Sequence, residues 1–304
     1  MARRKIPYTK RATTLEQQIQ KLKRKGVVIS DEEKVKEVLA DIGYYRLGFY
    51  IFPFEQTYPA LDHRRQHDVI PGTRIEDIVA LYYYDLDLRN ILNRYLSRIE
   101  VAIRTTIIYE LSNKYSTNPY WYVDPTIVDN GFIRTFTTNF YGKIKEKNPI
   151  KRHHQKYQEP YAPAWKAMEY MTLGNLENLY DKLRFNRDKS IISNKFGEPA
   201  MSKFKNYLAV TREVRNSCAH GNVIVGMSLT TNVQCGVACP TLPVGTQNTF
   251  YGALKVIDYL LRRVSVNRAN DMRDKIYDAT RNLYKVSPSL RSLVEQKTGV
   301  ILPD

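Results

Sequence analysis

Residues 74–114, RIEDIVALYYYDLDLRNILNRYLSRIEVAIRTTIIYELSNK, decide the fold. Apolar side chains recur every three or four residues along this stretch, which is the spacing of one face of an α-helix. Thr73-Arg74-Ile75-Glu76 forms a helix-start signal directly after Pro71-Gly72. The pattern predicts one helix of roughly 60 Å, at about 1.5 Å per residue, as the spine of a helical bundle. Its polar positions, among them Arg89, Arg98, Glu100 and Arg104, are expected to form a solvated face.

The remainder of the chain carries the same helical spacing in shorter segments, so the fold class is all-α. Further helices are expected at 14–25, 31–42, 129–147, 174–184, 187–195, 200–220, 249–268, 270–285 and 288–298. Residues 151–154, Lys-Arg-His-His, are expected to form a basic loop. Residues 222–248 are rich in Val, Thr, Gly and Cys and almost without charge, which predicts a small β-hairpin or an irregular insertion.

This spacing suggests three parts along the chain. Residues 1–12 are basic and aperiodic, and we expect a disordered arm there. Residues 13–70 are expected to form an N-terminal helical region, and residues 71–304 a helical-bundle domain that contains the 222–248 insertion.

The charge balance points to a polyanionic partner. The formal net charge is +16 and the pI is near 9.6, values that suit RNA, DNA or an anionic membrane. Nine Lys or Arg stand against one Glu in residues 1–25. An RNA-backbone contact and a solvated tail both explain this charge. The candidate RNA contacts in this stretch are Arg3, Arg4, Lys5, Lys21, Lys23, Arg24 and Lys25.

The same composition argues against a membrane and a metal. No run of 18 apolar residues occurs and no lipidation motif accompanies the basic arm. Three cysteines and no apolar signal core favour a reducing cytoplasm. Cys235 and Cys239 lack a second Cys or His pair, so no metal site is expected.

A motif that suits RNA chemistry ends the predicted helix 200–220. Residues 211–221 read TREVRNSCAHG. Arg212, Asn216 and His220 are spaced i, i+4, i+8 and line one helix face, with Arg215 beside it. Arginine holds a phosphate through paired hydrogen bonds, and histidine titrates near neutrality. Gly221 would release the chain, and an unwound last turn would let His220 approach Arg215.

These residues are sufficient for transesterification of RNA without a metal or cofactor. His220 would remove the proton of a ribose 2′-hydroxyl, Arg215 would stabilise the charged phosphoryl group, and Asn216 would orient the phosphate or the imidazole. Arg212 is an additional RNA contact. A second acid is needed for the leaving 5′-oxygen, and the same motif in a second chain would supply it. The expected assembly is therefore a homodimer with two motifs across one cleft.

Beyond the spacing, Arg215-Asn216-x3-His220 resembles the R-x4-H motif of HEPN ribonucleases. Four further segments resemble Abi-like abortive-infection proteins of the AbiD/AbiF type: TLEQQIQKLKRKGVVISDEE, IGYYRLGFYIFPF, RIEVAIRTTIIYELSNKY and APAWKAMEYMTLGNLENLY. The resemblance implies a HEPN-like bundle, a growth-arresting endoribonuclease in defence against phage, and a partner non-coding RNA. Members often carry a second His after the motif, where this chain has Gly221-Asn222-Val223.

Two other functions fit the same residues. A non-catalytic RNA-binding module would use Arg215, Asn216 and His220 to hold a partner non-coding RNA. A structural interaction protein would bury His220 at its helix end. Replacement of His220 by alanine is the test. It should abolish cleavage but keep RNA binding if the protein is a ribonuclease, and it should destabilise folding if His220 is a buried structural residue.

Overall fold

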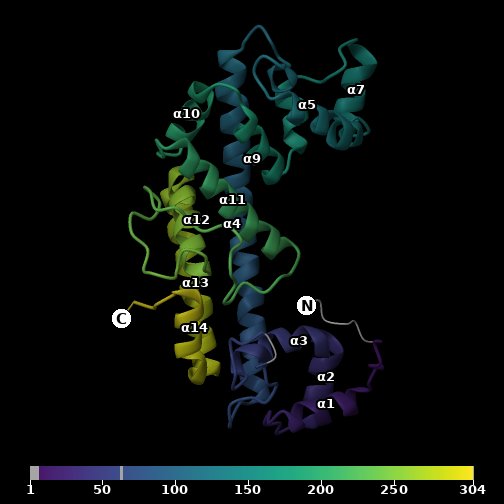
Figure 1. The fold of residues 1–304 in the computed structure, drawn as a ribbon, viewed down its shortest axis with the longest axis vertical. Coiled ribbons are helices and arrows are strands. Elements are labelled where there is room, and N and C mark those ends of the chain that lie inside the picture. The colour runs from purple at the N-terminus through teal and green to yellow at the C-terminus, as the bar shows by residue number, and fades with distance from the viewer. Residues whose placement is uncertain (1–6, 62–63, 304) are drawn as a thin grey trace, which may run out of the picture. The chain divides into compact units, whose positions relative to one another are not determined.

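The computed structural model describes residues 7–61 and 64–303. Within them the protein is built from helices and holds no β-sheet, only isolated bridges, which confirms the all-α class (Figure 1). Arg3, Arg4 and Lys5, which the sequence predicts to contact RNA, lie outside these residues. None of the described helices combines the length and the apolarity that a bilayer crossing requires.

The chain divides into two compact units. The first comprises the residues up to Leu86 together with Arg281–Ser292, and the second comprises Asp87–Thr280 and the residues from Leu293 onward. The predicted division near residue 70 remains a prediction. Every candidate catalytic residue belongs to the second unit.

The first unit starts with three short helices, α1 (Leu15–Arg24), α2 (Glu32–Ile42) and α3 (Tyr44–Ile51), and a 3-10 turn, η1 (Phe52–Phe54). The predicted helices 14–25 and 31–42 are confirmed, and each begins one residue later than expected. Thr14 and Gln17 bond reciprocally at the start of α1, and Asp31 accepts from the Lys34 amide at 3.0 Å. The helices pack through buried side chains such as Ile19, Leu22, Val35, Leu39 and Leu47.

The long helix α4 spans Ile75–Lys114, as the periodicity predicts. Its apolar stripe is fully buried in the second unit at Ile99, Ile103, Ile107 and Leu111. Its polar positions are not all solvated, and that prediction is wrong for three side chains. Arg89 and Glu100 are each 8% exposed, and the Arg104 side chain is 12% exposed.

Shorter helices complete the second unit. Their bounds are η2 (Trp121–Val123), α5 (Asn130–Phe136), η3 (Thr137–Tyr141, a π-helical turn), α6 (Gly142–Ile144), α7 (Asn148–Lys156), α8 (Ala164–Ala167), η4 (Met168–Tyr170), α9 (Leu173–Lys182), α10 (Asn186–Lys195), α11 (Met201–Ala219) and α12 (Phe250–Val264). Helices α13 (Val266–Val286) and α14 (Arg291–Thr298, after η5, Pro288–Leu290) contribute to both units. In Figure 1, α11 lies between α9 and α12, and it contacts both.

Residues 151–154 form part of helix α7 rather than the predicted basic loop. Pro149 occupies the first turn, where a missing amide proton costs nothing, and Ile150 and His153 are buried on one face. The run of charge therefore covers the exposed side of an amphipathic helix.

Residues 222–248 are irregular, and the β-hairpin alternative is wrong. Side chains of α11 take the place of a partner strand. The Glu213 carboxylate accepts from the amide and hydroxyl of Thr230 at 2.7 and 2.9 Å. Asn206 donates to the Asn232 carbonyl and accepts from the Gln234 amide at 2.8 and 2.9 Å. Hydrogen bonds to side chains of α11 thus hold the segment in place without a β-ladder.

Candidate active site at the end of α11

Helix α11 presents the Arg-Asn-His motif because its other face is buried. Phe204, Tyr207, Leu208 and Val214 are fully covered, whereas Arg212, Arg215 and Asn216 remain partly exposed. The burial of aromatic and branched side chains fixes the rotation of the helix about its axis. The motif side chains are therefore directed away from the core by the same pattern that forms the helix.

The C-terminus of α11 is a regular Schellman end. Gly221 has φ +72°, the Asn222 amide donates to the Ser217 carbonyl at 2.9 Å, and the Gly221 amide lies 3.4 Å from the Cys218 carbonyl. The backbone amide of His220 donates to the Asn216 carbonyl at 2.9 Å. The last turn is therefore helical, and the predicted unwinding toward Arg215 does not occur.

His220 caps this end with an exposed side chain. Within residues 7–61 and 64–303, no hydrogen bond or ion pair joins its imidazole to another group. This exposure contradicts the structural alternative, which requires a buried His220. The imidazole is accessible to a bound molecule.

A buried carboxylate from α4 holds Arg215. Arg215 Nε lies 3.3 Å from Glu100 Oε2, and Arg215 Nη1 donates to Asn216 Oδ1 at 3.3 Å. The other Glu100 oxygen accepts from Arg104 Nη2 at 3.0 Å. Two guanidiniums thus share one carboxylate, which leaves one formal positive charge. Because the Arg215 side chain is 30% exposed, part of its guanidinium still faces solvent.

Arg104 is fixed on further sides. Its Nη2 also donates to the Met171 carbonyl at 2.8 Å, and its Nη1 lies 3.9 Å from Glu169 Oε2. The helical spacing predicts Glu100 on a solvated face, which does not reveal its contact with Arg215. The available signal is the i, i+4 spacing of Glu100 and Arg104 along the helix.

Arg89, also on α4, approaches the helix end. A Cβ placed on Gly221 would lie 3.4 Å from Arg89 Nη1. The motif end therefore gathers three guanidiniums, from Arg89, Arg104 and Arg215, of which the sequence motif contains one. Glu100 offsets one of these charges, and the positive charge that remains suits a phosphate ligand.

Arg212 is engaged elsewhere. Its Nε is bonded to Glu177 Oε2 on α9, and its side chain is 38% exposed. It lines a shallow hollow that also contains Asp181 and Lys205. The structure therefore does not join Arg212 to Arg215, although both lie on α11.

The predicted basic contacts of α1 belong to the other compact unit. Lys23 is paired with Glu32, and Arg24 donates to the Gln20 carbonyl at 3.3 Å. The ammonium groups of Lys21 and Lys25 lie 5.9 and 5.7 Å from the centre of the Tyr44 ring. These side chains remain candidate RNA contacts.

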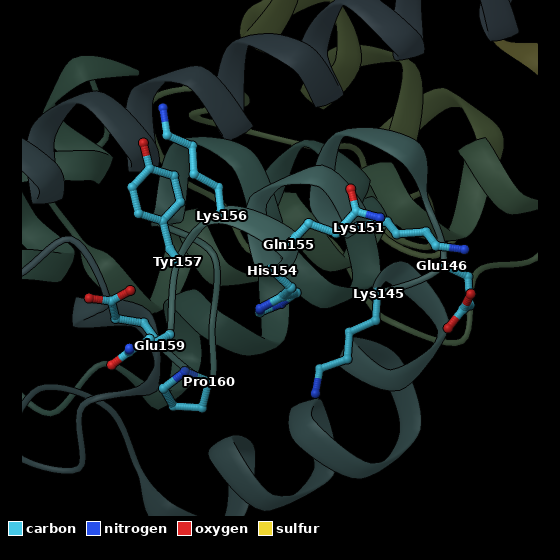
Figure 2. A pocket seen from close by; sticks show the side chains of 10 residues that line it. Lys145, Glu146, Lys151, His154, Gln155, Lys156, Tyr157, Glu159 and Pro160 are labelled. Carbon is cyan, nitrogen blue, oxygen red and sulfur yellow. The ribbon is translucent and has the colours of Figure 1, made fainter.

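A second basic region surrounds α7. A hollow of about 790 Å³, the His154 hollow, is lined by His154, Lys145 and Lys151 among others (Figure 2). The Tyr141 hydroxyl accepts the Ala162 amide proton and lies 3.0 Å from His154 Nε2.

Fold and site together define a class: an all-helical, strongly basic protein that presents Arg, Asn and His at one helix end, with a buried carboxylate behind the arginine. Residues 37–225 match the family described as Abi-like protein. This match covers more than half of the chain, so the chain belongs to the Abi-like protein family. Membership indicates a role in abortive infection. No curated protein and no solved structure matches the chain.

Proposed function

We propose that this Abi-like protein is a metal-independent endoribonuclease of the HEPN type, which acts in the cytoplasm as an anti-phage toxin. The observation that carries the proposal is the pairing of an accessible imidazole with an anchored guanidinium on one helix. His220 is exposed at the end of α11. Arg215 lies about one turn earlier on the same helix and is held by Glu100 of α4. The net charge of +16 suits a polyanionic substrate.

The reaction follows from these groups. His220 accepts the proton of a ribose 2′-hydroxyl, and the resulting oxygen attacks the adjacent phosphorus. The bond from phosphorus to the 5′-oxygen breaks, which leaves a 2′,3′-cyclic phosphate and a 5′-hydroxyl after protonation of the leaving oxygen. Arg215 stabilises the charge that builds on the phosphoryl oxygens. Asn216, whose Oδ1 accepts from Arg215, keeps the guanidinium oriented.

The proposal includes a second copy of the chain. One motif holds one histidine, and the leaving oxygen needs an acid. His220 of a partner copy would supply it if two α11 ends faced each other about a two-fold axis. A non-coding RNA is the further partner that the family resemblance implies.

A non-catalytic role has one specific observation in its favour. A general base is usually held by a third group, and in the described chain no hydrogen bond orients the His220 imidazole. The alternative is therefore an RNA-binding module in which Arg215 and His220 grip phosphate on a partner non-coding RNA.

One comparison separates the two functions. Purified wild type and His220→Ala are incubated with labelled single-stranded RNA in EDTA, and cleavage and binding are measured in parallel. The proposal predicts that the substitution lowers cleavage by at least about 100-fold and changes RNA affinity less than about threefold. No cleavage by either protein, together with weaker RNA binding by His220→Ala, would support the binding module instead.

A further inference from the structure

A hollow with exposed aromatic rings lies between α7 and the α8–η4 segment. It measures about 530 Å³, and we call it the α7 hollow. Its lining includes Arg152, Lys156, Tyr157, Trp165 and Lys166. The α7 hollow shares Lys156 and Tyr157 with the His154 hollow, and Figure 2 shows these two side chains directed away from those of His154 and Lys145.

Two large rings of the α7 hollow are open to solvent. Trp165 is 50% exposed and Tyr157 is 45% exposed. The other tryptophan, Trp121, is fully buried and donates to Ser112 Oγ at 3.1 Å. A half-exposed tryptophan forgoes part of the stabilisation that full burial of its ring would give. Aromatic faces beside cations commonly stack on unpaired bases.

Three cations surround these rings. Arg152 and Lys156 are exposed on α7, and Lys166 is half-buried on α8. The Lys156 ammonium lies 5.4 Å from the centre of the Tyr157 ring. Glu169 contributes the one carboxylate of this lining, so the formal charge of the hollow is positive. Rings for bases and cations for phosphates thus occur in one place.

The floor of the α7 hollow contains a polar group that lacks a partner. His153 is 6% exposed, and neither ring nitrogen has a hydrogen bond in the described chain. Its ring lies 4.8 Å from that of Tyr157 at 31°. Burial lowers the pKa of His153, and the neighbouring charges of Lys166 and His154 lower it further. Beneath the Tyr157 ring there is thus a buried imidazole whose two nitrogens lack a hydrogen-bond partner.

We infer that the α7 hollow binds a nucleobase of single-stranded RNA. The base stacks on Trp165 and Tyr157, and Arg152, Lys156 and Lys166 neutralise the flanking phosphates. This inference rests on the proposed function for the identity of the nucleic acid, and it specifies the substrate class as unpaired RNA. A base within a duplex has no free face for such stacking.

The α7 hollow is connected to the candidate active site by one chain of ion pairs. Glu169, on its wall, lies 3.9 Å from Arg104 Nη1, and Arg104 shares Glu100 with Arg215. The wall of the α7 hollow is therefore joined through ion pairs to the arginine that would hold the scissile phosphate.

Tryptophan emission provides the test, because Trp165 is accessible and Trp121 is not. The full-length His220→Ala protein, which leaves RNA intact, is titrated with a uridine 12-mer in EDTA. Quenching of emission should follow binding measured independently by anisotropy of labelled RNA. A 12-base-pair RNA duplex should quench at least about tenfold less at equal concentration.

Variants in the same background locate the site. Trp165→Ala should weaken binding by about tenfold or more, while Trp165→Phe keeps a ring and should stay within about threefold of its parent. Tyr109→Ala, at a ring 65% exposed on α4, is the matched control and should leave affinity unchanged. Lys166→Glu tests the electrostatic contribution independently, and it should weaken RNA binding if the RNA occupies the α7 hollow. Thermal melting confirms that each variant is folded.

Binding without quenching, or unchanged affinity in folded Trp165→Ala and Lys166→Glu, would overturn the inference; so would no binding at micromolar protein. The result is separable from the proposed function through the wild-type protein. If RNA quenches the emission but the wild-type protein does not cleave RNA, the proposed nuclease activity is refuted and the base-binding site is supported. If the wild-type protein cleaves RNA in EDTA but RNA does not quench the emission, the nuclease activity is supported and the base-binding site is refuted.

Discussion

Replacement of Glu100 by glutamine tests whether a buried carboxylate positions the candidate catalytic arginine. Glu100 accepts from Arg104 at 3.0 Å and lies 3.3 Å from Arg215 Nε. A glutamine keeps the shape but turns an NH2 group toward one of the two guanidiniums, so that donor faces donor. Arg215, which has fewer other partners, should lose its fixed position.

The magnitude follows from what each arginine retains. Removal of one partner of a buried ion pair costs about 3–5 kcal/mol. Arg104 keeps the Met171 carbonyl at 2.8 Å, and glutamine keeps one acceptor oxygen, so we expect about 2 kcal/mol. For a cooperative unit of about 200 residues this lowers Tm by about 4–8 °C. Misplacement of Arg215 should lower cleavage by about 100-fold.

Glu110→Gln is the matched control on the same helix. Glu110 pairs with Lys195 at 3.0 Å, but the lysine side chain is 58% exposed, so the pair contributes less than about 1 kcal/mol. Melting by differential scanning calorimetry and cleavage of labelled RNA are measured on both variants. If Glu100→Gln lost stability yet cleaved RNA at the wild-type rate, Glu100 would be structural and the positioning argument would be refuted.

Three further outcomes are expected. His220→Ala should shift the free energy of unfolding by less than about 0.5 kcal/mol in a denaturant titration, because the side chain is exposed; a loss of 2 kcal/mol or more would restore the structural alternative. Gly221→Ala should cost about 1–2 kcal/mol, since φ is +72° there and the added Cβ would lie 3.4 Å from Arg89 Nη1; an unchanged Tm would contradict this. Burial alone would raise the pKa of Glu55, but hydrogen bonds from Arg65 and His67 lower it below the usual 4.5. Glu55 therefore stabilises the fold above about pH 4.5, and this contribution disappears as pH falls through the lowered pKa, so Glu55→Gln should flatten acid unfolding followed by circular dichroism.

The sequence alone predicts the long helix and the helix that carries the motif. In α4 and α11 the apolar spacing is uninterrupted, and Gly221 marks the end of α11. The exposure of His220 was not predictable in the same way, because it depends on which neighbours pack around the helix end. The local pattern shows where a helix stops and not what covers it.

Polar positions of α4 illustrate the same limit. Glu100 and Arg104 look like surface charges within the helix, but the covering groups come from Met171 and Glu169, about 70 residues away. In residues 222–248 the composition suits a hairpin, yet Glu213 and Asn206 of α11 take up the backbone groups that a ladder would use. In both cases a distant segment decides the environment.

The central claim is tested most directly by the ends of the RNA fragments that the protein produces. Wild type and Arg215→Ala are incubated with a defined RNA in EDTA, and the fragment termini are read by mass spectrometry. Transesterification by His220 and Arg215 predicts 2′,3′-cyclic phosphate and 5′-hydroxyl ends from the wild type and loss of both from the variant. Ends of 3′-hydroxyl and 5′-phosphate, or unchanged cleavage by Arg215→Ala, would contradict it.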